Sequence, residues 1–295
     1  MKKEDKRKVE LVVLSDIHLG TFGCRAKEVL NYLKSIEPET LVLNGDIIDI
    51  WQFNKHYFPK SHMKVIKHIT NLLSKGKKVY YITGNHDEML RKFKGFQLGN
   101  LEIVNKLILN IDNKKAWFFH GDVFDVTMKN SKWLAKLGGL GYDLLIVINT
   151  IVNLFSRLLK RGRISFSKRV KDGVKGAFKH IRNFEDTVAG IAISNGYDYV
   201  VCGHIHQPKM KYISNKQGQQ VLYLNSGDWI ENLTALEYNE KEWLVYEYAK
   251  DPVAQNILDE VLPEIENTRF ESKRKQLFDD LVEELQFIPF NAAAN

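Results

Sequence analysis

Short apolar runs rich in β-branched residues recur along the chain, and polar residues follow most of them at once. Each run has the length of a buried strand. The runs are Val9–Leu14, Leu41–Asn44, Val79–Thr83, Ala116–Phe119, Tyr199–Cys202 and Val221–Asn225. Between several of them, apolar residues follow a helical pattern, over Lys27–Ile36 and over His62–Lys75, which Gly76 closes. This alternation predicts an α/β fold with helices packed on sheets.

The regular pattern breaks between about residues 125 and 183. An apolar stretch, Leu144–Leu159, is followed there by a basic one in which only Asp172 opposes the positive charge. We interpret this region as a helical cap inserted into a domain that spans residues 1–250. Residues 251–295 form a polar, amphipathic pattern that predicts a C-terminal helical extension.

Charge and cysteine usage narrow the class of protein. The net charge of +7 favours an anionic partner, which could be nucleic acid, anionic lipid or a phosphorylated small molecule. Cys24 and Cys202 show neither metal-ligand spacing nor a disulfide framework, so a reducing compartment is expected. The charged N-terminus lacks the apolar region of a signal peptide. We therefore expect a cytoplasmic protein.

Polar residues that can bind metal follow the apolar runs in five segments. These are Asp16–His18, Gly45–Asp49, Gly84–Asp87, His120–Asp122 and Gly203–His206. Ligands in an open α/β sheet bind beyond the carboxyl ends of the strands, so we expect these segments to meet at one edge. Carboxylate, imidazole and amide ligands without thiolates suit Mn, Fe or Zn. The set exceeds the needs of one ion, and two ions about 3.5–4 Å apart commonly serve in-line displacement at phosphorus.

Local geometry suggests how two of these segments present their ligands. Residues i and i+2 of a strand point to the same face. Asp16 with His18, and His204 with His206, would therefore each present two ligands together if the strand geometry continues through them.

Together, the five segments resemble the calcineurin-like metallophosphoesterase superfamily. The resemblance implies a four-layer α/β/β/α sandwich that hydrolyses phosphoesters. The implied metal ligands are Asp16, His18 and His206 for one ion, Asn85, His120 and His204 for the other, and Asp46 as the bridge. His86 would face the phosphate and stabilise or protonate the leaving oxygen, while Asp49 would orient the His86 ring. The expected substrate contacts are Asn85, His86, Arg157 and Arg161.

Within the superfamily, Ser15–Gly20 and Gly45–Trp51 resemble most closely the UDP-2,3-diacylglucosamine pyrophosphatases of lipid A synthesis. That group carries a helical lid where this chain has its insertion. The resemblance implies cleavage of a nucleotide-linked lipid to UMP and an acylated sugar 1-phosphate, with Mn as the metal. The apolar and basic cap would then contact the inner face of the membrane. One departure is His86, because the group typically has Gly-Asn-Arg-Asp where this chain has Gly84–Asp87.

Three alternatives share the chemistry and differ in substrate: a nuclease, a cyclic-nucleotide phosphodiesterase or a protein phosphatase. The basic region could follow a nucleic-acid backbone, but it lacks evenly interleaved aromatic residues for base stacking, which disfavours nucleic acid. A catalytically inactive binding protein on the same core is a rival of another class. All the expected ligand positions are filled, which favours an enzyme.

Overall fold

The computed structural model describes residues 6–50, 58–124 and 181–257. Its contacts divide the chain into two compact units, Met1–Gln255 and Asn256–Asn295, and every described strand belongs to the first. The predicted cap and C-terminal extension lie almost wholly outside the described residues, as do Leu144–Leu159, Arg157 and Arg161.

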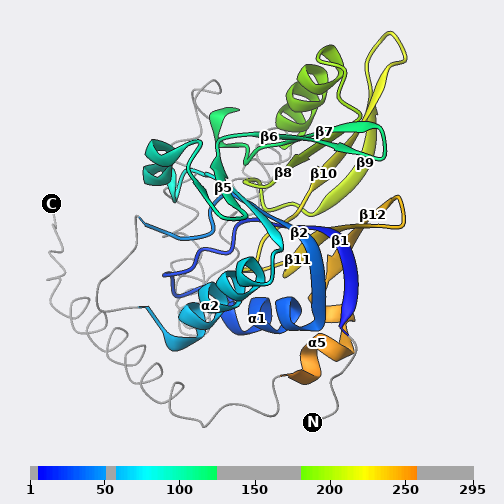
Figure 1. Ribbon diagram of the computed structural model, residues 1–295. Helices are drawn as coiled ribbons and strands as arrows, with labels where there is room; N and C mark the ends of the chain where they lie inside the picture. Colours follow the sequence, from blue (N-terminus) through cyan, green and yellow to red (C-terminus); the bar gives the residue numbers. More distant parts are fainter. Residues whose placement is uncertain (1–5, 51–57, 125–180, 258–295) are drawn as a thin grey trace, which may run out of the picture. The chain divides into compact units, whose positions relative to one another are not determined.

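Seven strands form the first sheet. In spatial order they are β12 (Glu242–Glu247), β11 (Thr234–Asn239), β1 (Arg7–Leu14), β2 (Ile36–Asn44), β3 (Lys78–Ile82), β5 (Leu101–Val104) and β4 (Gln97–Leu98). The central strands β1, β2, β3 and β5 run parallel. Parallel neighbours require crossover connections, which α1 (Ala26–Ser35) and α2 (Lys60–Ser74) provide on one face of the sheet (Figure 1).

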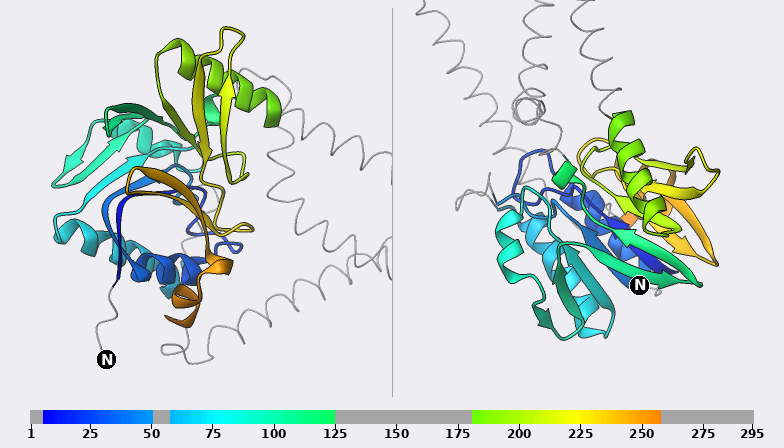
Figure 2. Two further views of the ribbon diagram at one scale, coloured as in Figure 1. Left: turned by 90° about the vertical axis from the view of Figure 1, so that its right-hand side faces the viewer. Right: turned by 90° about the horizontal axis from the view of Figure 1, so that it is seen from above.

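Five strands form the second sheet. Their order is β6 (Leu107–Ile111), β7 (Lys114–Phe118), β8 (Tyr199–Cys202), β10 (Gln220–Asn225) and β9 (Lys209–Ser214). The three central strands are parallel, and β6 and β9 close the edges antiparallel. A helix over residues 181–194 covers the face turned away from the first sheet (Figure 2). Short segments complete the fold: η1 (Glu88–Phe93), η2 (Asp122–Phe124), η3 (Tyr248–Lys250) and α5 (Pro252–Asn256).

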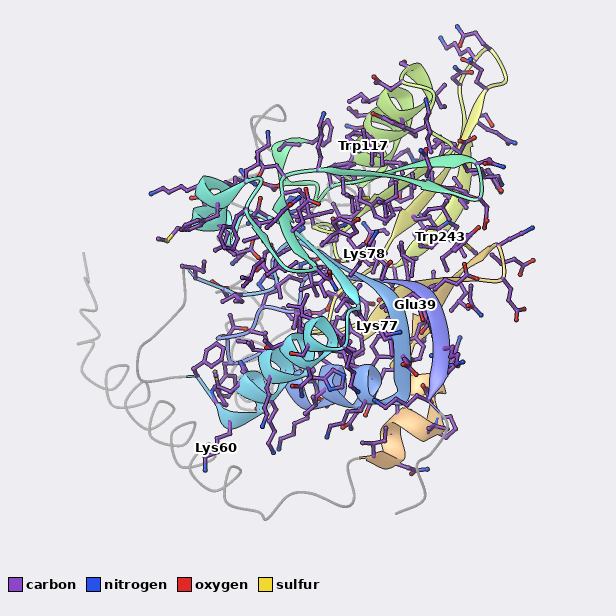
Figure 3. All side chains as sticks on the ribbon, viewed as in Figure 1. Glu39, Lys60, Lys77, Lys78, Trp117 and Trp243 are labelled. Carbon is purple, nitrogen blue, oxygen red and sulfur yellow. The ribbon has the colours of Figure 1, made fainter. Side chains whose placement is uncertain are left out.

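Three hydrophobic clusters separate four layers. On β1, Val12 and Leu14 belong to the cluster under α1 and α2, whereas Leu11 and Val13 belong to the cluster between the sheets. Strand β8 divides its side chains likewise between the inter-sheet cluster and the cluster under helix 181–194. Trp243 lies in the inter-sheet cluster, and Figure 3 marks its position. The predicted α/β/β/α sandwich is therefore confirmed.

The expected elements are present, with bounds that shift by a few residues. The Lys27–Ile36 and His62–Lys75 patterns correspond to α1 and α2, and Gly76 ends α2 with a φ of 79°. All six predicted strands exist, but β4, β5, β6, β9, β11 and β12 were not predicted. No helix within the described ranges is long and apolar enough to cross a membrane.

Strand β11 illustrates why some strands escaped detection. Its sequence contains Glu237, which reads as a surface residue but is buried in the structure. Arg7 donates two hydrogen bonds to this carboxylate, one of them 2.9 Å long, and the Tyr32 hydroxyl donates another of 2.8 Å. A buried charge with such partners is tolerated, yet it removes the continuous apolar run that marks the central strands.

Candidate active site and its family

Ligand-bearing residues lie just past the ends of four parallel strands. Asp16, Asp46, His120 and His204 follow the last residues of β1, β2, β7 and β8, respectively, by two positions. Asp16 and Asp46 thus come from the first sheet, and the two histidines come from the second. The edge at which both sheets present their carboxyl ends is the expected place for a ligand in an α/β fold.

The backbone turns left-handed at five of these residues. The φ angles are 52° at Asp16, 55° at His18, 53° at Asp46, 66° at His204 and 51° at His206. The strand geometry on which the pairing of residues i and i+2 depended therefore does not continue through these residues. Such φ values cost about 1–3 kcal/mol each for residues other than glycine, and they concentrate at functional sites. Hydrogen bonds between loops hold the conformation, including one of 2.9 Å from His18 N to Asp46 O.

The structure gathers the candidate ligand atoms into three overlapping groups, each within 4.8 Å. The groups are Asp16, His18 and His206; His18, Asp46 and His86; and Asp46, His120 and His204. Asp46 and His18 each belong to two groups and so connect them. His204 and His206 belong to different groups, whereas Asp16 and His18, which also have left-handed φ angles, share one. The first group holds the three residues that the resemblance implies for one ion. The third holds Asp46, His120 and His204, and Asn85, the further implied ligand, is half-buried in the loop after β3.

Carboxylate oxygens and imidazole nitrogens face one another in the site at distances that favour a positive charge between them. His206 Nε2 lies 3.1 Å from Asp16 Oδ1, and His120 Nε2 lies 3.2 Å from Asp46 Oδ2. His18 Nε2 is buried, with no hydrogen-bond partner among the described residues. Although burial alone would raise the pKa of Asp16, His206 and His120 lower it to about 2. Burial opposes charge on His206, but Asp16 raises the pKa of that ring to about 9. A divalent cation supplies the same positive charge, so the residues fit a metal.

Backbone contacts orient several ligands. His120 Nδ1 lies 2.9 Å from the carbonyl oxygen of Asn44, which places the ring proton there and leaves Nε2 for a metal. The Asp16 carboxylate accepts a hydrogen bond of 3.0 Å from His204 N. The backbone carbonyls of two ligands are also held: Asn232 Nδ2 donates to His206 O at 2.9 Å, and Trp229 N donates to Asp16 O at 3.1 Å.

His86 and Asp49 form a hydrogen-bonded pair beside the ligand groups. His86 Nδ1 lies 2.9 Å from Asp49 Oδ2; the His86 side chain is partly exposed, and Asp49 is buried. Burial is the largest single influence on His86 and lowers its pKa, but the hydrogen bond to Asp49 and the charges of Asp46 and Asp49 together outweigh it, so the net pKa is raised. The backbone N–H of His86 also donates to Asp46 Oδ1 at 2.8 Å. An imidazole whose Nδ1 proton is held by a carboxylate presents Nε2 to a substrate.

Sequence reasoning assigned no role to Asp87, which joins two of the loops. Its carboxylate is fully buried and accepts hydrogen bonds from Gly84 N at 2.6 Å, Ile47 N at 3.0 Å and the Tyr81 hydroxyl at 2.6 Å. The loop after β3 is thereby tied to the loop after β2. The signal available in the sequence was the place of Asp87 within the Gly84–Asp87 segment.

Arg91 and Asn232 were also missed, and they act on the loops from outside the five segments. Arg91 donates to Gly84 O at 3.4 Å and forms an ion pair with Asp122. No local pattern marks either residue, since the Arg91–Asp122 and Asn232–His206 contacts join residues 31 and 26 positions apart.

Comparison with known proteins agrees with this geometry. A family model described as calcineurin-like phosphoesterase matches residues 9–208, which contain all five segments. The chain belongs to the calcineurin-like phosphoesterases. It is a metal-dependent hydrolase with the mixed α/β fold of that family.

Individual relatives are distant. The UDP-2,3-diacylglucosamine hydrolase of Wigglesworthia glossinidia brevipalpis is 27% identical over 79% of this chain and 92% of its own length. The DNA double-strand break repair protein Mre11 of Methanococcus maripaludis is 23% identical over 90% of this chain and 72% of its own length. A solved archaeal phosphodiesterase is 16% identical, with a TM-score of 0.38 over 80% of this chain and 98% of its own length.

Proposed function

We propose that this phosphoesterase cleaves the pyrophosphate of UDP-2,3-diacylglucosamine or a closely related nucleotide-linked lipid. The products would be UMP and the acylated sugar 1-phosphate. The hydrolytic part rests on one observation, the convergence of carboxylates and imidazoles from both sheets into overlapping ligand groups. The lipid substrate is supported by the similarity to hydrolases named for that compound, which extends over most of both chains.

Seven side chains would hold two divalent cations. They are Asp16, His18 and His206 for one site, Asn85, His120 and His204 for the other, and Asp46 shared by both. Two such cations, Mn²⁺ in our proposal, would supply positive charge opposite the phosphoryl oxygens of the substrate.

His86 and Asp49 supply the proton chemistry. His86 Nε2 would donate a hydrogen bond or a proton to the leaving oxygen, while Asp49 keeps the ring oriented through Nδ1. The hydrogen bond from His86 N to Asp46 Oδ1 connects this proposed proton donor to a proposed metal ligand. Substrate would also contact Asn85 and, from the cap, Arg157 and Arg161.

A second candidate is hydrolysis of another phosphodiester or pyrophosphate. His86 favours it, because this residue stands where the nucleotide-lipid hydrolases typically have arginine. An arginine grips phosphate as a fixed cation, whereas a histidine exchanges a proton. The similarity to a DNA double-strand break repair protein makes DNA one substrate to include.

In the cell, we propose a cytoplasmic enzyme held at the inner face of the membrane, with cap residues of about 125–183 among its contacts. A membrane-side location would give it access to a diacylated substrate.

Release of UMP from UDP-2,3-diacylglucosamine by Mn-loaded protein tests the proposal. An Asp46→Asn variant serves as the control, because it removes the carboxylate that the two proposed metal sites would share. Release that the variant loses supports both the chemistry and the substrate. Hydrolysis of bis(p-nitrophenyl) phosphate or single-stranded DNA without UMP release would keep the chemistry and reject the lipid. Absence of metal binding and of any hydrolysis would reject the whole assignment.

A further inference from the structure

The segment Met89–Leu98 exposes an unusual amount of apolar surface. Met89 is 57% exposed, Phe93 54%, Phe96 47% and Leu98 62%. Scattered apolar side chains on a surface are normal, but four large ones within ten residues indicate an interaction site. The segment begins in η1 and ends in β4, the outermost strand of the first sheet beside β5 (Figure 1). We call it the apolar edge.

The fold holds the apolar edge in place. Leu90 packs against the hydrophobic cluster under α1 and α2. Gly95 N donates to Ile103 O at 2.8 Å, and Ile103 N donates to Phe96 O at 3.0 Å. Leu98 then pairs with Leu101 across β4 and β5. The exposure of these side chains is therefore built into an ordered part of the sheet.

Basic residues are interleaved with the apolar ones. Arg91, Lys92 and Lys94 lie within the segment, which contains no acidic residue, although Glu88 directly precedes it. Arg91 pairs with Asp122. Lys92 and Lys94 are exposed, and no ion pair with either lies within the part of the chain described. The apolar edge thus combines exposed apolar side chains with two lysines, Lys92 and Lys94, that form no ion pair within the described residues.

We infer that the apolar edge docks the protein on an anionic lipid surface. Phenylalanine, leucine and methionine side chains enter the boundary between headgroups and acyl chains, and lysines beside them attract anionic headgroups. A second copy fits less well, because a symmetric contact would bring the lysines of both copies together. Single-stranded nucleic acid also fits less well, since Met89 and Leu98 provide no aromatic face for base stacking.

Docking at this edge would bring the candidate active site to the membrane. The segment η1 starts immediately after Asp87, and Arg91 contacts the carbonyl of Gly84, which precedes Asn85. The inference deepens the proposed function by identifying a surface that would deliver a diacylated substrate. Binding to vesicles needs no turnover, however, so the two ideas can fail separately.

Co-sedimentation of the full chain with vesicles tests the inference. The probes are vesicles of phosphatidylglycerol mixed with phosphatidylcholine, and vesicles of phosphatidylcholine alone. We expect the protein to prefer the anionic vesicles. Phe93→Ser combined with Phe96→Ser should weaken binding by at least about tenfold. Lys92→Gln combined with Lys94→Gln should remove most of the preference for anionic lipid, a loss of roughly tenfold or more.

A matched control lies on β9. Met210 and Tyr212 are 45% and 63% exposed, and Lys209 and Lys211 alternate with them, but both lysines pair with Glu185. Met210→Ser combined with Tyr212→Ser should leave vesicle binding unchanged. All variants should hydrolyse bis(p-nitrophenyl) phosphate as the unmodified protein does, which verifies the fold.

Several results would overturn the inference. They are failure of the unmodified protein to sediment, retention of binding in the phenylalanine variant, or an equal loss in the β9 control. Binding of a labelled oligonucleotide that depends on Phe93 and Phe96, without vesicle binding, would assign the edge to nucleic acid instead. If the Phe93→Ser, Phe96→Ser variant loses vesicle binding but still releases UMP from detergent-dispersed substrate, the result supports both lipid docking by the apolar edge and the proposed function.

Discussion

The imidazole of His86 lies between a buried carboxylate and the candidate ligands, so its removal tests the proposed acid directly. We expect His86→Ala to lower kcat about 10²- to 10³-fold on a substrate with a poor leaving group, because the leaving oxygen loses its proton donor. Metal content, measured by atomic absorption, should stay unchanged. Unaltered kcat would remove His86 from the reaction, and a loss of metal would make it a ligand instead.

Asn232 acts on His206 through the backbone, and its loss should weaken metal binding without removing a ligand. The side chain donates to His206 O at 2.9 Å and so helps to hold a left-handed residue. Asn232→Ala should raise the Kd for Mn²⁺ by about tenfold in a competition titration. Asn215→Ala is the control, because Asn215 bonds with Gln219 within the β9–β10 turn. Equal effects of the two changes would contradict a positioning role for Asn232.

The identity of the ligand candidates was predictable from the sequence, but their conformation was not. Asp16, Asp46 and His120 each follow an apolar run closely, which is a local signal. The left-handed φ of Asp16 is fixed by contacts such as the one from Trp229 N, more than two hundred residues away in the chain. Local patterns carry no information on such contacts.

At the scale of single elements, two glycines should respond oppositely to an added methyl group. A Cβ on Gly84 would lie 2.2 Å from Asp46 Oδ1 and 2.6 Å from Asp46 N. Gly84→Ala should therefore displace Asp46 and reduce bound metal to below one ion per chain.

On helix 181–194, a Cβ on Gly190 meets nothing within 4 Å. Gly190→Ala should raise the free energy of unfolding by about 0.5–1 kcal/mol, as measured by urea denaturation. Full metal content in Gly84→Ala, together with a loss of stability in Gly190→Ala, would show that the loop after β3 can move to accommodate the added methyl group.

Element prediction succeeded where burial on both faces leaves a continuous apolar run; it failed at the four sheet edges and at the interior strands β5 and β11. Strand β9 alternates half-buried and exposed residues, and β4 has only two residues, both exposed. Edge strands satisfy weaker packing demands, so polar residues are tolerated there and the apolar signal fades.

At the scale of the whole molecule, metal should stabilise the fold because its proposed ligands come from both sheets. A ligand that binds only the folded state adds about 2.7 kcal/mol at a free concentration of 100 times its Kd. Differential scanning fluorimetry with Mn²⁺ and then with EDTA should show a higher Tm with the metal. The Asp46→Asn variant should lose most of this difference. An identical Tm under both conditions would argue against metal binding at the sheet junction.

Acid stability should depend on His68 in α2. Burial, reinforced by the charge of Lys6, lowers the pKa of His68 to about 4. In the unfolded chain an imidazole titrates near about 6.5, so between these values only the unfolded chain binds the proton. The contribution of His68 to stability is thus lost as the pH falls from about 6.5 to about 4. By about pH 5 the loss should be roughly 2 kcal/mol, and His68→Gln should reduce it in urea titrations at about pH 7.5 and about pH 5. An unchanged pH dependence would assign the acid sensitivity to other groups.

The layered architecture also gives the protein a set of optical reporters. Trp229 belongs to the cluster under α1 and α2, Trp243 to the cluster between the sheets, and Trp117 packs against the cluster under helix 181–194. Trp117 and Trp243 can be found in Figure 3. Variants that keep one of these indoles and replace the other four tryptophans of the chain would let the emission spectrum follow the hydration of one interface at a time. A common transition for all three would mean that the layers separate together, whereas staggered transitions would reveal which interface admits water first.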